Sequence, residues 1–224
     1  MQTYRMLLEK PITEGLEFIV EEQNTKEPAN YFLQGPYLMY DKPNKNKRQY
    51  TQLEMTNEVA RYKDEFVVRN RALGELNHPA DSTEVDLSKA CHMIVSLEQK
   101  DRNYFWGKSK ILSTPSGVCV RQLLSDGCSL GISSRALGRL VPRGDINIVE
   151  GFRLLALDLV HEPSVSDAML DSIMENRQYI IQEGGKIVEL ACDSLECRLN
   201  SIPKKDVNEY LAESFAKFFQ SLKG

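Results

Sequence analysis

The chain has 224 residues, of which 42% are hydrophobic and 27% are charged, so it is long enough for one large or two small domains. No apolar run approaches the roughly 18–20 residues of a membrane span, and the N-terminal residues lack the apolar stretch of a secretion signal, which favours a cytoplasmic protein. The net charge of -4 argues against a general nucleic-acid binder. We therefore expect neither a membrane nor a specific nucleic acid as a partner.

The five cysteines are odd in number and include no C-x-x-C pair, so they predict neither a disulfide framework nor a zinc site. They are Cys91, Cys119, Cys128, Cys192 and Cys197. Cys192 and Cys197 are close enough in sequence to pair or to bind a metal together. The simpler interpretation is that all five are buried or idle thiols in a reducing compartment.

The first half of the chain predicts strands followed by a helix. Residues 17–22 and 31–40 are extended segments separated by polar turns, and the basic loop DKPNKNKRQY follows at 41–50. A helix is predicted from about residue 52 to residue 70. Its apolar residues recur on one face at helical spacing: Met55, Val59, Tyr62 and Phe66.

The region beyond residue 74 predicts more strands around one short helix. The strands are expected at 90–101, 103–113, 128–141 and 145–160. The helix is expected at 115–126, because Pro115 marks its start and Gly127 stands just past its end. No G-x-G-x-x-G or P-loop motif is present. This order favours an α+β fold with a mixed sheet or barrel over a nucleotide-binding fold.

The C-terminal part predicts two helices separated by the residues EGG. The first covers 164–181, where Ser164 and Asp167 have a spacing like that of a capping box. The second carries apolar and aromatic residues along one stripe from Val207 to Leu222. A stripe of this kind is most often packed against a core, and a partner surface or a removable tail is the alternative.

Two short stretches could carry chemistry. GELNHP contains His78 in a turn that Pro79 stiffens, which is a suitable way to hold an imidazole as a general base. GISSRALG contains Ser133 and Ser134, and strand alternation places them on opposite faces. If Ile132 points into the core, Ser134 shares its face and Ser133 lies where a substrate could reach it. Alone, each stretch has an ordinary structural interpretation as a turn or as polar surface.

Together the motifs are specific. NKNKRQY, GELNHP, GISSRALG and PSVSDA, in this order from Asn44 to Ala168, closely resemble the prohead proteases of T4-like tailed bacteriophages. These proteases belong to the capsid-maturation serine proteases that include the herpesvirus assemblins. The resemblance implies an α+β fold with a small mixed β-barrel and surrounding helices. It also implies a serine endopeptidase that cleaves scaffold, core and capsid proteins inside the prohead, in the host cytoplasm.

The resemblance implies a role for each matched residue. His78 takes the place of the general base, and Ser133 that of the nucleophile, with Ser134 as the weaker candidate. Asp158, in the strand before PSVSDA, is expected to accept the His78 Nδ1–H as the third member of a triad. His161 competes with it, because assemblins use a second histidine.

Other parts of the site are left open. Arg135 is expected either to hold a water for the oxyanion or to make a structural ion pair. The NKNKRQY loop, with Arg48 and Tyr50, has no role that the residues predict; a scaffold contact and a solvated turn are both open. No metal and no organic cofactor is expected, because a triad and an oxyanion hole suffice for acyl transfer.

The sequence allows two alternative functions. One is a non-catalytic capsid or scaffold component that keeps the protease fold, and the other is a cysteine-dependent hydrolase. The second fits poorly because no cysteine lies in a matched motif. The expected partners are phage scaffold and core proteins and the major capsid protein as substrates, with self-association as a further possibility.

Self-cleavage is also expected, because proteases of the resembled family favour glutamate preceded two residues earlier by Ile or Leu. Three such sites end at Glu175, Glu189 and Glu213, and a fourth, ending at Glu75, abuts the histidine motif. Glu189 is preferred because it follows the EGG break, in the C-terminal part of the chain, where backbone opens most readily. We therefore divide the chain into a protease domain over 1–182 and a C-terminal helical tail over 183–224, which self-cleavage could remove.

Overall fold

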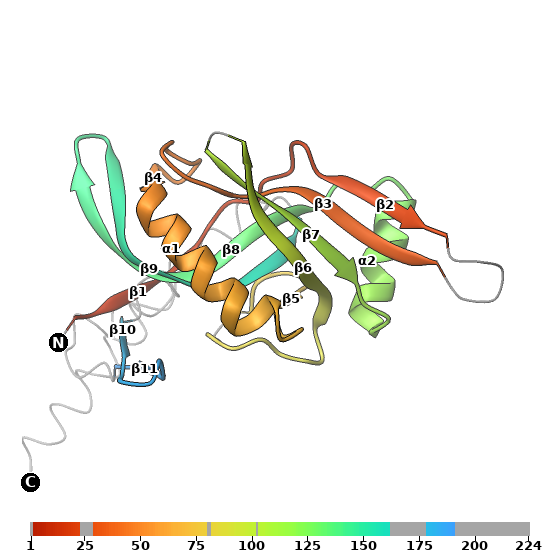
Figure 1. The fold of residues 1–224 in the computed structure, drawn as a ribbon. Coiled ribbons are helices and arrows are strands. Elements are labelled where there is room, and N and C mark those ends of the chain that lie inside the picture. The colour runs from red at the N-terminus through yellow and green to blue at the C-terminus, as the bar shows by residue number, and fades with distance from the viewer. Residues whose placement is uncertain (1, 23–28, 80–81, 102, 162–177, 191–224) are drawn as a thin grey trace, which may run out of the picture.

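A computed structural model describes residues 2–22, 29–79, 82–101, 103–161 and 178–190. These residues form mostly strands, arranged as two open sheets, together with two α-helices (Figure 1). The helices are α1 (Gln52–Tyr62), which continues as the π-helical turn η1 (Lys63–Val67), and α2 (Pro115–Ser125). Within the described residues, no helix is long and apolar enough to cross a membrane.

The first sheet has six strands in the order β11-β10-β1-β8-β9-β4. Their bounds are β1 Tyr4–Leu8, β4 Arg48–Tyr50, β8 Gly131–Arg143, β9 Ile146–Val160, β10 Gln178–Ile181 and β11 Ile187–Glu189. The long antiparallel hairpin of β8 and β9 forms its centre, and the tip of this hairpin extends beyond the other strands (Figure 1). The two strands expected at 128–141 and 145–160 are confirmed.

Strand β1 was missed by the sequence analysis. It lies between β8 and β10 and is buried on both faces: Leu7 belongs to the main core, while Met6 and Leu8 pack with Leu137 and Tyr179 on the other side. A strand buried on both faces has a continuous apolar run instead of an alternating pattern, so periodicity does not reveal it.

The second sheet has five strands in the order β2-β3-β7-β6-β5. Their bounds are β2 Glu17–Glu21, β3 Asn30–Met39, β5 Leu73–Glu75, β6 Ala90–Asp101 and β7 Tyr104–Ile111. β6 and β7 form the expected hairpin, and α2 packs against both. The predicted face of α1 is confirmed, because Met55, Val59 and Tyr62 are buried in the core next to β9.

The closed barrel expected from the resemblance is not formed by the described residues, whose two sheets stay open. Two isolated bridges join the first sheet to segments outside the named strands: Leu159 pairs with Leu76, just after β5, and Ile132 pairs with Ile12, between β1 and β2. β9 already pairs with β8 along nearly its whole length and with β4 near its start. Along the middle of β9, the N–H groups of Gly151, Phe152 and Leu154 donate to the carboxylates of Glu54 and Glu58 on α1. Leu159 bonds the turn after β5, and this contact is too short to close a barrel.

The C-terminal predictions are only partly covered by the described residues. The helix expected over 164–181 lies mostly outside them, and its last residues, Gln178–Ile181, are strand β10, so the helix prediction is wrong there. The helix at 207–222 lies wholly outside them. The boundary after residue 182 falls in the turn between β10 and β11, which pair with each other. The division into two domains stays a prediction.

Candidate active site

Ser133 and Asp158 are direct cross-strand neighbours in the β8–β9 hairpin. His78 comes from the turn after β5, and this turn is held to the end of β9 by the Leu76–Leu159 bridge and by a 2.7 Å hydrogen bond from Asn77 N to Leu159 O. Asn77 has a φ of +66°, a left-handed conformation that asparagine tolerates well. The turn therefore brings the imidazole over two strands that are distant from it in sequence.

The three side chains form one continuous chain of hydrogen bonds. His78 Nε2 lies 2.8 Å from Ser133 Oγ, and His78 Nδ1 lies 2.8 Å from Asp158 Oδ2. The Asp158 side chain is fully buried, and that of His78 is 13% exposed. Burial by itself raises the pKa of Asp158, but the bond from His78 and the nearby Arg135 charge outweigh it, so the pKa lies below its ordinary value. Asp158 is thus held as a carboxylate.

The two competing candidates lie elsewhere. Ser134 lines a small cavity of about 50 Å³ with Ile132, Tyr37 and Met55, on the face of β8 opposite to Ser133. His161 is exposed just past the end of β9, and within the described residues it makes no hydrogen bond to Ser133, His78 or Asp158. The structure therefore brings together Ser133, His78 and Asp158 and leaves Ser134 and His161 apart from them.

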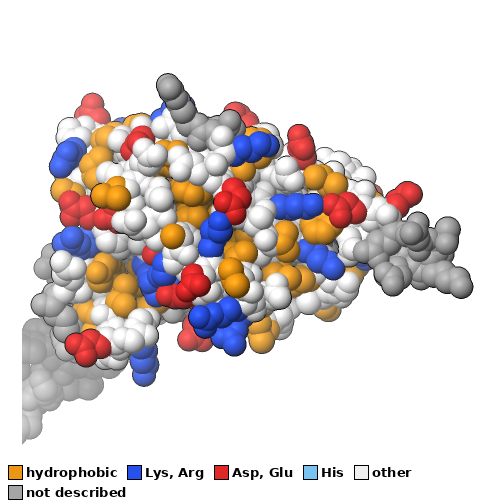
Figure 2. All heavy atoms as spheres, in the orientation of Figure 1, with side chains coloured by type: hydrophobic (Ala, Val, Ile, Leu, Met, Phe, Trp, Pro, Cys, Tyr) orange, Lys and Arg blue, Asp and Glu red, His pale blue; other side chains and the backbone are white. Residues whose placement is uncertain are grey.

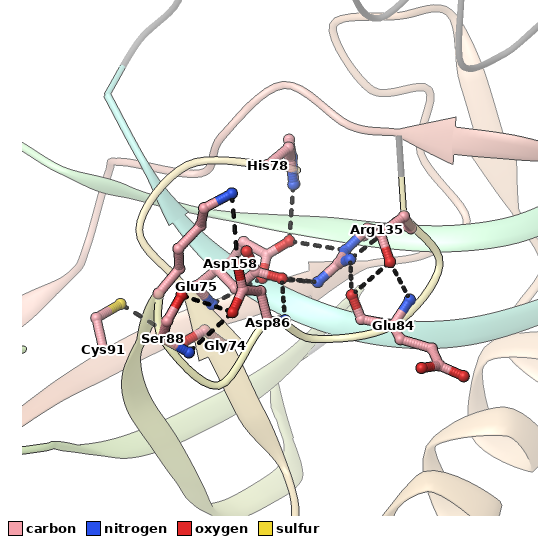
Figure 3. A network of polar contacts seen from close by, with 11 residues as sticks. Gly74, Glu75, His78, Glu84, Asp86, Ser88, Cys91, Arg135 and Asp158 are labelled. Atoms are coloured by element: carbon pink, nitrogen blue, oxygen red, sulfur yellow. Dashed lines mark hydrogen bonds and ion pairs between the residues drawn. The ribbon is translucent and has the colours of Figure 1, made fainter. Parts of the chain in front are cut away.

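Behind Asp158 lies the guanidinium of Arg135, whose side chain is fully buried (Figure 3). Its Nε donates to Asp158 Oδ2 at 3.1 Å, and its Nη2 donates to Glu75 Oε1 at 3.1 Å and to Asp158 Oδ1 at 3.4 Å. Its Nη1 donates to the carbonyls of Ser82 and Glu84, each at 3.0 Å. All five N–H groups are used. Of the two roles expected for Arg135, the ion pair is the one observed.

Glu9 meets Ser133 from the other side. The Ser133 hydroxyl donates a hydrogen bond to the backbone carbonyl of Glu9, and Ser133 is only 1% exposed. The Glu9 carboxylate is held by the NKNKRQY loop: it accepts from Asn44 Nδ2 at 2.7 Å, from Asn46 Nδ2 at 2.8 Å and from the hydroxyl of Tyr50. Arg48 lies 3.4 Å from it. The loop whose role the sequence left open thus fixes the segment that covers Ser133.

Cysteines take no part in this arrangement within the described residues. Cys91 is buried, its Sγ donates to the Gly74 carbonyl at 3.5 Å, and burial raises the pKa of its thiol. Cys119 and Cys128 are exposed, and Cys192 and Cys197 lie outside the described residues. Among the residues that the structure describes, no group of three or more His, Cys, Asp or Glu side chains could hold a metal ion.

The model of the prohead core protein serine protease family matches residues 2–178 of the chain. The chain belongs to this family. It is 32% identical over 142 residues to the prohead core protein protease of Enterobacteria phage T4, covering 61% of this chain and 66% of that one. It thus spans slightly less than two thirds of the length of this curated relative. The solved structure of the bacteriophage T4 capsid assembly protease has a TM-score of 0.64 and 28% identity, and the similarity covers 71% of this chain and 99% of that one.

Membership in the family of prohead core protein serine proteases confirms the resemblance stated from the motifs. The fold is that of the T4 protease, with two sheets that stay open among the described residues. The alternative of a cysteine-dependent hydrolase has no support from the family or from the positions of the described cysteines.

The sequence analysis missed two acidic residues of the site, Glu9 and Glu75. Glu75 stands inside the GELNHP motif and is fully buried beside Arg135, so its place next to a buried arginine is visible only in the fold. Glu9 ends the apolar run of β1, and a charged residue there had no pattern to mark it. Gly74 of the same motif does not have a positive φ. Glycine is needed because a Cβ there would lie 2.1 Å from His92 Nε2.

Two larger cavities lie away from the three residues. One of about 830 Å³ lies between η1, β9 and the β10–β11 turn, and one of about 490 Å³ is lined by residues 10–15 with Asn44 and Trp106. The lining of the second includes Lys10, which follows Glu9, whose carbonyl accepts a hydrogen bond from Ser133. On the face shown in Figure 2, acidic and basic side chains are intermixed with apolar ones, and neither charge dominates.

Proposed function

We propose that this chain is a serine endopeptidase in which Ser133 is the nucleophile, His78 the general base and Asp158 the residue that orients the imidazole. The observation that carries the proposal is the imidazole itself, which lies 2.8 Å from the serine hydroxyl on one side and 2.8 Å from a buried carboxylate on the other. This is the geometry that acyl transfer by a serine requires.

The mechanism follows from these contacts. Asp158 holds the proton on Nδ1 of His78, so that Nε2 is free to accept the Ser133 proton as Oγ bonds to the carbonyl carbon of the substrate peptide. The imidazolium then gives this proton to the leaving nitrogen when the C–N bond breaks, and water hydrolyses the acyl-enzyme in the same way. The charge on Asp158 stabilises the imidazolium without Asp158 taking up a proton.

The Ser133 hydroxyl has one proton and two neighbouring acceptors, Nε2 of His78 and the Glu9 carbonyl. Cleavage requires this proton to pass to His78, so the bond to Glu9 must break when a substrate peptide enters. The site as observed is therefore a resting arrangement.

The substrates that best fit are proteins of the prohead: scaffold and core proteins and the major capsid protein. The support is family membership and the likeness to the T4 capsid assembly protease. Action inside the prohead, in the host cytoplasm, follows from the same likeness. Self-association stays open.

Self-cleavage after Glu189 belongs to the same proposal. The peptide between Glu189 and Leu190 lies at the end of β11, where Leu190 N donates to Gln178 O at 2.8 Å. β11 is a three-residue edge strand, which opens more readily than the central hairpin. Intact mass should show a product ending near Glu189 in the active chain and none in the Ser133→Ala chain. A chain that cleaves its scaffold and stays whole would contradict self-cleavage alone.

The decisive experiment is incubation of the full chain with a purified prohead scaffold protein. Ser133→Ala should abolish cleavage, whereas the matched neighbour variant Ser134→Ala should keep it. Normal cleavage by Ser133→Ala would remove this residue from the mechanism. A chain that never cleaves, in either form, would instead identify a non-catalytic component of the capsid or scaffold with a protease fold.

A further inference from the structure

The acid of the proposed triad is in contact with a positive charge that the mechanism does not use. Asp158 accepts two hydrogen bonds from the Arg135 guanidinium, and both side chains are fully buried. A buried guanidinium keeps its charge. It holds Asp158 ionised and correctly oriented, but it also repels the imidazolium that His78 must become.

Glu75 offsets this repulsion. Its carboxylate lies 3.1 Å from Arg135 Nη2 and is fully buried, and its backbone N–H donates to Asp158 Oδ1 at 2.9 Å. With Glu75 ionised, Glu75, Asp158 and Arg135 sum to one negative charge, and protonation of His78 makes the whole cluster neutral. With Glu75 uncharged, the same proton would leave a net positive charge in the protein interior, where unbalanced charge is costly.

We propose that Glu75 and Arg135 are positioning residues for catalysis: Arg135 orients Asp158, and the negative charge of Glu75 allows His78 to take up the proton of Ser133. The inference rests on the proposed function. Arg135 also binds the carbonyls of Ser82 and Glu84, and Glu75 accepts from Asp86 N at 3.0 Å. The pair therefore also fixes the backbone that follows the His78 turn (Figure 3).

Among the described residues, three buried titratable groups near the cluster are uncharged near neutral pH, while hydrogen bonds from Ser88 lower the pKa of the exposed Asp86, whose N–H bonds Glu75. Burial raises the pKa values of Tyr62 on α1 and of Cys91 on β6. Burial lowers the pKa of His92, also on β6, to about 4. Burial raises the pKa of Glu75 above its ordinary value, and the bond from Asp86 N and the Arg135 charge offset only part of that rise. The charge state of Glu75 is therefore the quantity that the test must measure.

The test is NMR titration of the histidine ring resonances in the full chain, which has three histidines. Glu75→Gln keeps an oxygen that can accept from Arg135 and Asp86, and it replaces the charged carboxylate by a neutral amide of the same shape. We expect the His78 resonance to titrate roughly one pH unit lower than in the unchanged chain, because a nearby negative charge is lost. On scaffold protein, kcat should fall roughly tenfold with little change in KM, since one unit corresponds to a factor of ten.

Glu58→Gln is the matched control. Glu58 is also a buried carboxylate that pairs with an arginine, Arg61, and accepts from a backbone N–H, that of Leu154 at 2.6 Å. This variant should lose stability and leave the His78 titration and kcat unchanged. An unshifted His78 resonance in folded Glu75→Gln would overturn the inference.

A second measurement needs no variant and stays decisive if Glu75→Gln does not fold. Carbon-13 NMR of the carboxyl groups in the unchanged chain shows whether Glu75, assigned through the amide of Asp86, is ionised at pH 7. A protonated Glu75 would overturn the inference. Failure of the proposed function is separate: there, Ser133→Ala cleaves scaffold normally or the unchanged chain does not cleave, whatever the His78 titration shows.

Discussion

Two buried carboxylates flank Ser133, and they act through different parts of the molecule. Asp158 lies behind His78 with its side chain fully buried, and it bonds the imidazole directly. Glu9 lies on the opposite side with its side chain 9% exposed, and it reaches Ser133 only through its backbone carbonyl. The carboxylate of Asp158 faces a ring that changes charge in the proposed mechanism, whereas that of Glu9 faces amides, a phenol and an arginine that do not.

Asp158 and Glu9 both accept several hydrogen bonds, but their carboxylates have different roles. On the Asp158 side the charge itself matters, so removal of charge should affect rate. On the Glu9 side the hydrogen bonds fix the path of the chain, so their loss should affect stability first. The following variants separate the two sides.

The largest effect is expected at Ser133 and His78, where the two sides meet. Ser133→Ala and His78→Ala should each abolish cleavage of scaffold protein, and the double variant should be hardly worse than either, because triad members act as a unit. Circular dichroism should show that the fold is kept. Additive losses in the double variant would mean that the two residues do not act together.

Asp158→Asn should lower kcat by roughly 10⁴-fold, as expected when the orienting carboxylate of a triad is replaced by an amide. Substrate binding should change far less, because Asp158 is fully buried and does not reach the substrate. Steady-state kinetics on scaffold protein give both values. A small loss of kcat would assign the orienting role to another group and bring the exposed His161 back into consideration.

Acid stability should depend on His92, which packs against the Asp158 side. Its side chain is fully buried, and burial lowers its pKa from 6.5 to about 4. His92 therefore becomes protonated below pH 6.5 in the unfolded chain, but only below about pH 4 in the folded chain. The free energy of unfolding should fall by about 3 kcal/mol across this window and level off below it.

Urea denaturation at pH 7, 5.5 and 4 measures this loss, and His92→Gln should remove most of the slope in that window. Asp158, whose pKa is lowered, contributes stability that is lost only at more acidic pH, below its ordinary value near 3.8. An equal slope with and without His92 would assign the acid sensitivity to other groups.

The smallest effect is expected at Glu9. Glu9→Gln should lower the free energy of unfolding by about 1–2 kcal/mol, because hydrogen bonds to a charged group are weakened, while kcat should change by only a few-fold. Glu14→Gln, at an exposed glutamate a few residues further on, is the control and should change neither. If Glu9→Gln lost as much kcat as Asp158→Asn and kept normal stability, the proposed difference between Glu9 and Asp158 would be wrong.

Much of the fold and of the proposed site was determined by the sequence alone. Local patterns predicted α1, α2 and the four strands β6, β7, β8 and β9, because residue spacing and start and stop signals are properties of each segment. The motifs that carry His78 and Ser133 predicted the family, and strand alternation separated Ser133 from Ser134 before the register was known. These are local properties, because they depend on residues that are close together in the sequence.

Only the tertiary structure decided the rest. β1 is buried on both faces and β10 replaces part of a predicted helix, and in both cases pairing with distant strands overrides the local pattern. The sequence already favoured Asp158 over His161, but only the cross-strand register places Asp158 directly opposite Ser133. Glu9, Glu75 and Arg135 join the site from three separate segments of the chain. Charge pairing and burial depend on which segments pack together in the fold. The periodicity of one segment does not show which other segments it will contact.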